Sequence, residues 1–369
     1  MPDVIIIGAG AIGSATAWRC AQRGLTVELV DPDPDRGAWR TAAGMLAPIT
    51  ELHYTESALL RLNLDSLARF PSFVAELGDA TGLATGYQEC GTIEVAWDGA
   101  DLQALRDLHH FGASLGLASH LLTTRELRSL EPSLAIGLPG GLLAEHDHQV
   151  DPRLLHAAQL QAALNLGVRV HRQNARVDVR DGRARGVMLD DGTTLSGGTV
   201  VLAAGAWAGA IDAVPVRPVK GQTLRLRLRG APRLARVVRA MVQGSPVYIV
   251  PRVDGRFVIG ASSEEVGFDR ASRAGAVYEL LRDAQAIVPE LGEAELEEVC
   301  TAFRPGSADN APLIGASSVD GLLHATGHYR NGILLTPVTA DAIAEMIAEG
   351  TVPAVVAPFA ASRPVGVTT

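Results

Sequence analysis

The feature that most constrains the fold lies in the first thirteen residues. An apolar run, Val4–Ile7, leads directly into the turn Gly8-Ala9-Gly10-Ala11-Ile12-Gly13. Such a run is typical of a strand buried on both faces, and a G-x-G-x-x-G turn after it opens into a helix. The first glycine permits the tight turn, the second lets a pyrophosphate approach the backbone, and the third lets helix and strand pack closely. The pattern predicts the start of a dinucleotide-binding fold.

The residues that follow this turn support the same interpretation. A helix is expected from about Ala11 to Arg23, ending at Gly24, and a second apolar run, Val27–Val30, ends at Asp31. An acidic residue at about this distance from the turn accepts hydrogen bonds from a ribose. Backbone N–H groups at the helix start hold the phosphates. We therefore expect a bound dinucleotide, with NAD and FAD both open on these residues alone.

Composition limits the classes of protein to consider. The 369 residues are enough for two domains, and the net charge of −9 argues against nonspecific nucleic-acid binding. Three cysteines, far apart in sequence, make neither a disulfide framework nor a metal motif. The apolar N-terminus carries Asp3 and lacks the basic segment of a signal peptide, and no stretch approaches the ~20 apolar residues of a membrane helix. We expect a soluble, cytoplasmic protein with no nucleic-acid or membrane partner.

The order of the expected elements points to two interleaved units. Asp181-Gly182 and Asp191-Gly192 predict the reversals of a three-stranded meander, which leads into a buried strand at Thr199–Leu202. Beyond Pro215 the pattern alternates as in antiparallel strands, and the chain closes on a helix from about Thr339 to Glu349. The predicted fold class is α/β: a Rossmann-like nucleotide domain interleaved with a mainly antiparallel β-sheet substrate domain of α+β type.

Two polar patterns receive ordinary structural interpretations. Thr223–Arg229 alternates leucine with arginine, which is typical of a sheet with one solvated face. His146-Asp147-His148 offers two imidazoles with no third ligand fixed nearby, so we interpret it as a polar loop and expect no metal site.

Four segments carry a family resemblance: the Gly8–Gly13 turn, Ala42–Leu46, Leu202–Trp207 and Gly327–Leu334. In this order and spacing they resemble the FAD-dependent amine and amino-acid oxidases of the D-amino acid oxidase superfamily. Thr301–Gly315, taken with Gly327–Leu334, is most similar to the bacterial glycine oxidases of thiamine (thiazole) biosynthesis. The resemblance covers the whole chain. It implies that residues 1–85, 145–215 and 302–369 form the FAD-binding domain, and residues 86–144 and 216–301 the substrate-binding domain.

The resemblance implies how FAD is held. Asp31 would accept from the adenosine ribose, Ala43-Gly44-Met45 would offer N–H groups to the isoalloxazine edge, and Gly327–Leu334 would run under its pyrimidine, near O2. Val177, or Ala175, would contact adenine through the backbone. Ala38 and Trp39 stand where related proteins usually have Ser or Thr, which puts side-chain contacts to the pyrophosphate in question there. The full cofactor-binding set is Gly8, Ala9, Gly10, Ala11, Ile12, Gly13, Asp31, Pro32, Ala38, Trp39, Ala43, Gly44, Met45, Val177, Gly205, His328, Tyr329, Arg330, Asn331, Gly332, Ile333 and Leu334.

The resemblance also implies three substrate-binding side chains. Arg304 would grip the substrate carboxylate through its planar fork, and the structural alternative is an ion pair with Asp309. Tyr248 would close the pocket and donate to the same carboxylate, and the alternative is an ordinary buried strand tyrosine. Arg330 would be a second active-site arginine, and the alternative is a surface or flavin-only contact.

The implied reaction is oxidative deamination of glycine or another small amine. Hydride would pass to FAD, the resulting imine would hydrolyse, and O2 would reoxidise the flavin to give H2O2. Cys300 does not match the cysteine that tethers flavin in some sarcosine oxidases, so we expect noncovalent FAD. The family implies a homo-oligomer. The alternatives are a D-amino acid or sarcosine oxidase, a flavin dehydrogenase that reduces a quinone, and a noncatalytic FAD- or NAD-binding protein.

Overall fold

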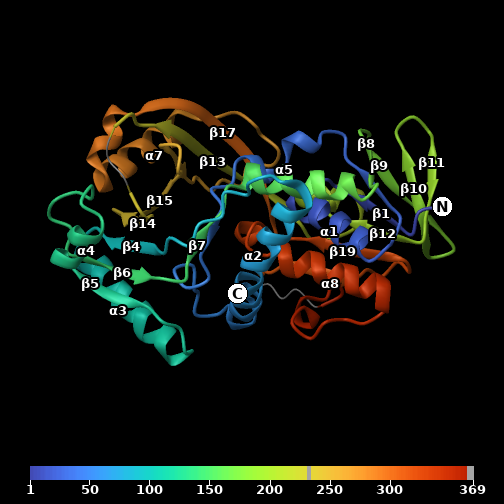
Figure 1. Ribbon diagram of the computed structural model, residues 1–369, viewed down its shortest axis with the longest axis horizontal. Coiled ribbons are helices and arrows are strands. Elements are labelled where there is room, and N and C mark those ends of the chain that lie inside the picture. The colour runs from blue at the N-terminus through green and yellow to red at the C-terminus, as the bar shows by residue number, and fades with distance from the viewer. Residues whose placement is uncertain (231–233, 364–369) are drawn as a thin grey trace.

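The computed structural model describes residues 1–230 and 234–363, and its backbone is organised around two large sheets (Figure 1). A six-stranded sheet in the order β18-β19-β12-β1-β2-β8 lies in one half of the molecule. Its strands are parallel except for β18, which pairs antiparallel with β19. Their bounds are β1 (Val4–Ile7), β2 (Val27–Val30), β8 (Arg169–His171), β12 (Thr199–Leu202), β18 (Leu313–Ala316) and β19 (Leu322–Thr326).

The first strand explains why this sheet needs cover on both sides. Val4 and Ile6 belong to the core shared with the helices, whereas Ile5 and Ile7 belong to a separate core on the opposite face. The helices on the first side are α1 (Ala11–Gln22), α2 (Ser57–Thr81), α5 (Pro152–Asn165) and α8 (Thr336–Glu349). A three-stranded sheet, β11-β10-β9, covers the second side with β9 (Ala175–Arg180), β10 (Arg183–Leu189) and β11 (Thr194–Ser196).

The predicted meander and its first turn are confirmed. β9 and β10 pair antiparallel around Asp181-Gly182, and both turn residues have positive φ (52° and 73°), the conformation that an Asp-Gly hairpin favours. The last helix ends as predicted at Gly350, which is left-handed with φ 70°.

An eight-stranded, mainly antiparallel sheet occupies the other half, in the order β17-β13-β16-β15-β14-β4-β6-β5. The pairing of β14 with β4 is parallel. The bounds are β4 (Thr92–Ala96), β5 (His120–Thr123), β6 (Gly140–Ala144), β13 (Arg217–Arg227), β14 (Val237–Val242), β15 (Ser245–Pro251), β16 (Arg256–Gly260) and β17 (Glu295–Gly306). Three helices belong to this half, α3 (Gly99–Ser114), α4 (Thr124–Leu130) and α7 (Ala274–Ile287) (Figure 1).

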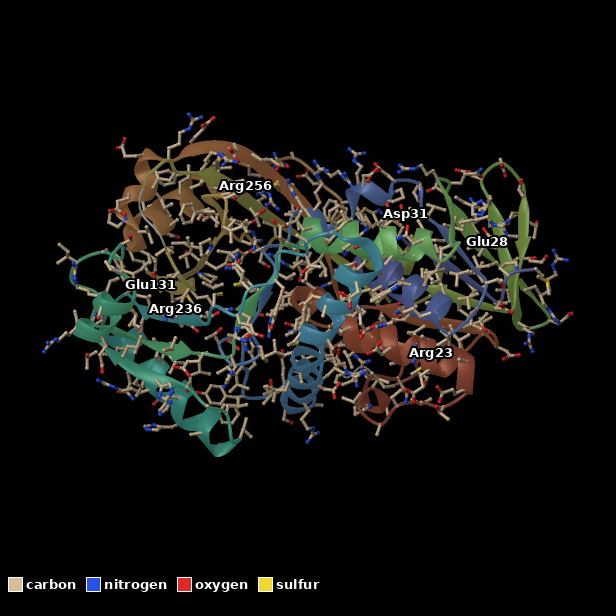
Figure 2. All side chains as sticks on the ribbon, in the orientation of Figure 1. Arg23, Glu28, Asp31, Glu131, Arg236 and Arg256 are labelled. Carbon is tan, nitrogen blue, oxygen red and sulfur yellow. The ribbon has the colours of Figure 1, made fainter. Side chains whose placement is uncertain are left out.

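The two faces of this sheet have different chemistry. Apolar side chains that alternate along the strands, such as Ile93, Leu224 and Ile249, form a core with residues of α4 and α7. The opposite face carries polar residues such as Thr223 and Arg225, and also Val250 and Val258, which pack with Ala43. Near the outer end of the sheet, Glu131 and Arg236 form an ion pair of 3.3 Å (Figure 2).

The prediction that the arginines of Thr223–Arg229 face solvent is wrong at Arg225. Its side chain is buried and donates to the carbonyl oxygen of Arg40 at 3.1 Å. Strict alternation places Arg225 on the face opposite the leucines, but there it contacts Arg40, which lies outside the sheet, rather than water. Arg229, beyond the end of β13, is exposed as expected.

The chain visits the eight-stranded sheet twice, at residues 92–144 and 217–306. β17 therefore crosses residue 302, where the sequence places a domain boundary. The division into 1–85, 145–215 and 302–369 against 86–144 and 216–301 stays a prediction. Short elements outside both large sheets include the strand pair β3 (Met45–Leu46) and β7 (His148–Gln149), and helix α6 (Ala208–Ile211).

Candidate active site

A cleft with a volume of about 610 Å³ lies between the two large sheets, and both contribute to its walls. Most of the residues proposed from the sequence line it. The cofactor-binding candidates among them are Gly8, Gly10, Ala11, Ile12, Asp31, Pro32, Ala38, Trp39, Ala43, Gly44, Met45, Gly205, His328, Tyr329, Arg330, Gly332 and Ile333. The substrate-binding candidates Arg304 and Tyr248 line it as well.

The glycine turn shapes one end of this cleft. Gly8 has φ 106°, and a side chain there would overlap the Ala203 carbonyl on β12. A side chain at Gly13 would overlap the Gly8 carbonyl, so this glycine lets α1 pack on β1. Gly10 is the N-cap of α1, and a Cβ on it would meet nothing closer than Trp39 Cδ1, at 4.0 Å. The helix start is therefore open to the cleft, as an anion site requires.

Asp31, at the carboxyl end of β2, organises that turn (Figure 2). One carboxylate oxygen accepts the Ala9 N–H at 2.7 Å, and the other accepts the Asp33 N–H at 2.8 Å. Each oxygen keeps further lone pairs, so the carboxylate remains able to accept from a ribose hydroxyl. Asp31 thus has a structural role in addition to the predicted one.

The polar wall of the cleft follows from strand register. Tyr248 pairs with Gly260 on one side and with Arg239 on the other, and Arg239 pairs with Glu94. Directly paired residues project from the same face of a sheet. This row therefore places a tyrosine, an arginine and a glutamate side by side on one face of the eight-stranded sheet, and of these three Tyr248 lines the cleft.

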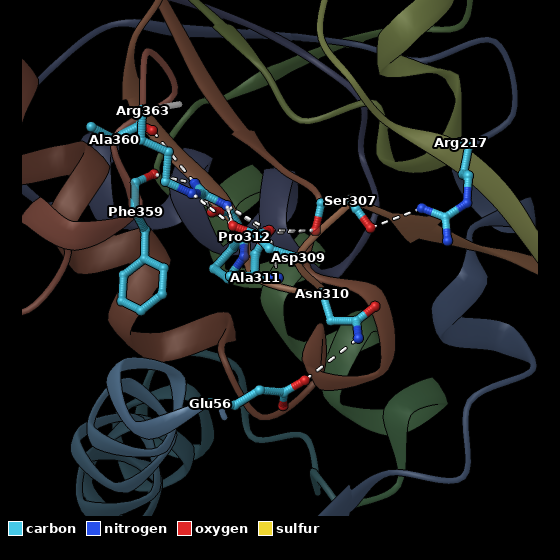
Figure 3. Close-up of polar contacts among 10 residues, drawn as sticks. All are labelled: Glu56, Arg217, Ser307, Asp309, Asn310, Ala311, Pro312, Phe359, Ala360 and Arg363. Atoms are coloured by element: carbon cyan, nitrogen blue, oxygen red, sulfur yellow. Dashed lines mark hydrogen bonds and ion pairs between the residues drawn. The ribbon is translucent and has the colours of Figure 1, made fainter. Parts of the chain in front are cut away.

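Arg304 extends from β17 into the same wall. Its Nη1 donates to the Ser262 carbonyl at 3.1 Å, and among the described residues it forms no ion pair with a carboxylate. The structural alternative, a pair with Asp309, is wrong. Asp309 instead accepts from two nitrogens of Arg363, from Nη2 to Oδ1 at 2.9 Å and from Nε to Oδ2 at 3.1 Å (Figure 3). The Arg304 guanidinium is thus left available in the cleft.

Tyr248 is a neutral phenol at physiological pH. Burial raises the pKa of its hydroxyl, and the positive charge of Arg304 offsets part of that rise. A neutral phenol is a hydrogen-bond donor, so Tyr248 has the protonation state needed to donate to an anionic ligand.

Arg330 belongs to a network of charges at the cleft. It donates to Glu56 at 2.9 Å and lies 3.5 Å from Glu51, and Glu51 in turn accepts from Arg239 at 2.6 Å. Glu56 also accepts from Asn310 at 3.5 Å (Figure 3). The Arg330 side chain is therefore held by two carboxylates rather than exposed on the surface.

The segment 327–334 turns beside the cleft before α8 begins. His328 is fully buried, and its Nε2 lies 3.0 Å from Thr339 Oγ1 on α8. Burial lowers the pKa of this imidazole to about 3, so the ring is neutral. Tyr329 has positive φ (45°), which turns the chain at this point.

Five of the proposed cofactor-binding residues do not line the cleft: Ala9, Gly13, Val177, Asn331 and Leu334. Ala9 and Gly13 nevertheless shape the turn through their backbones. Val177 packs in the core under the three-stranded sheet, whereas Ala175, its alternative, lines the cleft.

Sequence reasoning missed other residues of the walls, among them Arg36, Glu51, Trp207, Gly221, Thr223 and Arg270. Glu51 follows Met45 by six positions in a loop, and no local pattern distinguishes it from a solvated glutamate. Gly221 and Thr223 are identified only by register, because they share a face with Tyr248.

The remaining candidates have structural roles. Asp147 accepts from the backbone of Ile49 and Thr50, at 3.0 and 2.7 Å. Within the described parts of the chain, no three His, Cys, Asp or Glu side chains gather so as to hold a metal ion. Cys300 is buried outside the cleft lining, with its sulfur 3.5 Å from Arg153.

These observations together fit a flavin dinucleotide. The open N-terminus of α1, the Asp31 carboxylate and the small residues of the walls suit phosphates, a ribose and a planar ring. The fold and the cleft are those of a dinucleotide-dependent oxidoreductase. Residues 3–346 match the family model described as FAD dependent oxidoreductase (DAO). The chain belongs to this family and uses FAD.

Several relatives are similar over nearly the whole chain. The bifunctional protein ThiO/ThiG of Trichormus variabilis is 36% identical over 94% of this chain, and glycine oxidase of Geobacillus kaustophilus is 34% identical over 99% of it. The match covers 97% of that glycine oxidase, whereas the chain spans about half (53%) of the length of the bifunctional relative. The crystal structure of the Geobacillus enzyme superposes with a TM-score of 0.91, covering 99% of each chain at 35% identity.

Among the described residues, no helix combines the length and the apolar character that crossing a bilayer requires.

Proposed function

We propose that this protein is a glycine oxidase, which converts glycine, O2 and water to glyoxylate, ammonia and H2O2. The observation that carries the proposal is the Arg304 guanidinium, which lies in the cleft wall without a carboxylate partner among the described residues. A planar fork of this kind suits a substrate carboxylate. The similarity to glycine oxidase of Geobacillus kaustophilus over both full chains supports the assignment.

The proposed substrate site has three parts. Arg304 grips the carboxylate, and the neutral Tyr248 hydroxyl donates to the same group. Arg330, held by Glu56 and Glu51, contributes positive charge at the cleft without moving into it. Their common task is orientation, because holding the substrate in a reactive geometry supplies a large share of the rate.

The proposed cofactor site follows the cleft. The α1 start holds the pyrophosphate, Asp31 and Pro32 hold the ribose, and Ala175 contacts adenine. Ala43–Met45 and residues 328–333 flank the isoalloxazine, and we propose that the FAD is noncovalent. FAD, when bound, accepts a hydride from the substrate carbon and passes the electrons to O2. No side chain is needed as a general base if glycine enters with a neutral amine.

Substrate size separates glycine from the other small amines that the site could accept. One methyl group changes discrimination by only ~1–3 kcal/mol, so sarcosine and small D-amino acids are the direct competitors of glycine. A role in thiamine thiazole biosynthesis is proposed from the similarity to the ThiO/ThiG protein. A cytoplasmic location, a homo-oligomeric state and the two interleaved domains are proposed with it.

The decisive experiment is anaerobic reduction of the bound flavin. Glycine, sarcosine, D-alanine and D-proline are mixed with the protein without O2, and bleaching near 450 nm is followed. We expect glycine to give the highest second-order rate constant for flavin reduction. Faster bleaching by sarcosine or a D-amino acid would replace the assignment by that oxidase. Slow reoxidation in air, with fast reduction of a quinone, would indicate a dehydrogenase. No bleaching by any of the four would reject the activity.

A further inference from the structure

Trp39 occupies an unusual place for an indole. It lies on a single 3-10 turn, η2 (Ala38–Arg40), beside the start of α1, and its ring lines the cleft. Trp39 is 8% exposed, and its Cδ1, the atom next to Nε1, would lie 4.0 Å from a Cβ built on Gly10.

The indole N–H lacks an acceptor. Across residues 1–230 and 234–363, no oxygen or nitrogen accepts from Trp39 Nε1, although the atom is buried. A buried donor without a partner costs about 1–3 kcal/mol, and such groups are rare in folded proteins. Trp39 Nε1 therefore lies where an acceptor from outside the chain is needed.

Two neighbours fix the ring in this position. The imidazole of His156 stacks on it, with ring centroids 3.9 Å apart and planes 11° from parallel. His156 is itself held because its Nε2–H donates to the Ala9 carbonyl at 2.8 Å. On the edge of the ring, a Cβ at Gly37 would stand 2.5 Å from Trp39 Nε1, so only glycine leaves room for the indole.

We propose that Trp39 Nε1–H donates a hydrogen bond to the pyrophosphate of FAD. Stacking on His156 fixes the plane of the indole. His156 in turn donates to the Ala9 carbonyl, in the glycine turn proposed to hold the same phosphates. The proposal rests on the placement of FAD in this cleft. In this chain an indole N–H therefore serves as a hydrogen-bond donor to a phosphate.

The test compares ligands with and without phosphates on the full chain after removal of FAD. Dissociation constants of FAD, ADP and adenosine are measured by calorimetry for the wild type and for Trp39→Phe. The variant keeps an aromatic ring that can stack on His156, and it removes the N–H together with part of the indole ring. We expect its Kd for FAD and for ADP to rise about 10- to 100-fold, because a hydrogen bond to a charged phosphate is lost. The Kd for adenosine should not change.

Trp97→Phe, a half-buried tryptophan of the other core, is the matched control and should bind all three ligands like the wild type. A change of less than threefold for ADP, or an equal loss for adenosine, overturns the proposal. If Trp39→Phe does not fold, Gly37→Ala tests the same contact, because its methyl group displaces the indole; it should then weaken ADP and spare adenosine. Failure of the wild type to bind ADP at all would instead reject the placement of FAD.

Discussion

The guanidinium of Arg304 lies against the backbone of Gly221, so closely that a Cβ at residue 221 would stand 2.6 Å from Nη1 and 2.8 Å from Nη2. Gly221 is in the middle of β13, where its φ is not positive, so it is needed for space rather than for conformation. Gly260 on β16 serves Tyr248 in the same way, because a side chain there would overlap the phenol. Two glycines thus form the recesses that hold the proposed carboxylate-binding side chains.

Gly221→Ala should displace the guanidinium without unfolding the strand. We expect KM for glycine to rise about tenfold or more, because one charge-assisted hydrogen bond is misaligned, while kcat changes less and FAD stays bound. Steady-state H2O2 production and the flavin spectrum measure these quantities. Gly275→Ala, on α7 with open space around it, is the control. If both variants have the same KM, the recess has no role in binding.

Removing the guanidinium altogether should have a larger effect. Arg304→Ala is expected to lower kcat/KM for glycine by roughly 10²-fold or more, since two hydrogen bonds to a carboxylate contribute about 1.5–3 kcal/mol each. Arg304→Lys restores the charge but not the planar fork, and should recover only part of the loss. Near-full activity of Arg304→Ala, with FAD retained, would show that another group holds the carboxylate. Arg229→Ala, an exposed arginine beyond β13, is the control.

Some residues of the proposed site can be predicted from the sequence alone, and others cannot. Arg304 and Tyr248 were found from a family resemblance, and the Gly8–Gly13 turn and the Asp181-Gly182 hairpin from local chemistry. The turn and the hairpin can be predicted because they depend on residues that are adjacent in the chain. Gly221 and Glu51 could not be found in that way, since their importance comes from side chains that are distant in sequence. The face of Arg225 was misjudged for the same reason: alternation predicts which residues share a face, but not what covers it.

Glu51 offers a test of the charge network. It accepts from Arg239 at 2.6 Å and lies 3.5 Å from Arg330, and all three side chains are largely buried. Glu51→Gln removes one of the negative charges that balance Arg239 and Arg330. We therefore expect the free energy of unfolding to fall by about 2 kcal/mol. Urea titration measures it. Glu295→Gln removes an exposed carboxylate 4.0 Å from Arg229 and should change stability by less than about 0.5 kcal/mol. Equal losses would mean that Glu51 contributes no more than a surface pair.

His328 predicts a pH dependence of stability. Burial lowers the pKa of its imidazole from the usual 6.5 to about 3, so the folded protein does not take up this proton as pH falls through 6.5, whereas the unfolded chain does. Stability from this group is therefore complete above pH 6.5 and is lost toward pH 3, at up to about 1.4 kcal/mol per pH unit. In His328→Gln the loss between pH 6.5 and 5 should be smaller by about 1.6 kcal/mol. Urea unfolding of the full chain without FAD measures both proteins, so that cofactor loss does not contribute.

The exposed His120→Gln is the control, and its pH dependence should match the wild type. If His328→Gln also keeps the wild-type pH dependence, the imidazole is protonated in the folded protein and the assignment of a neutral ring is wrong.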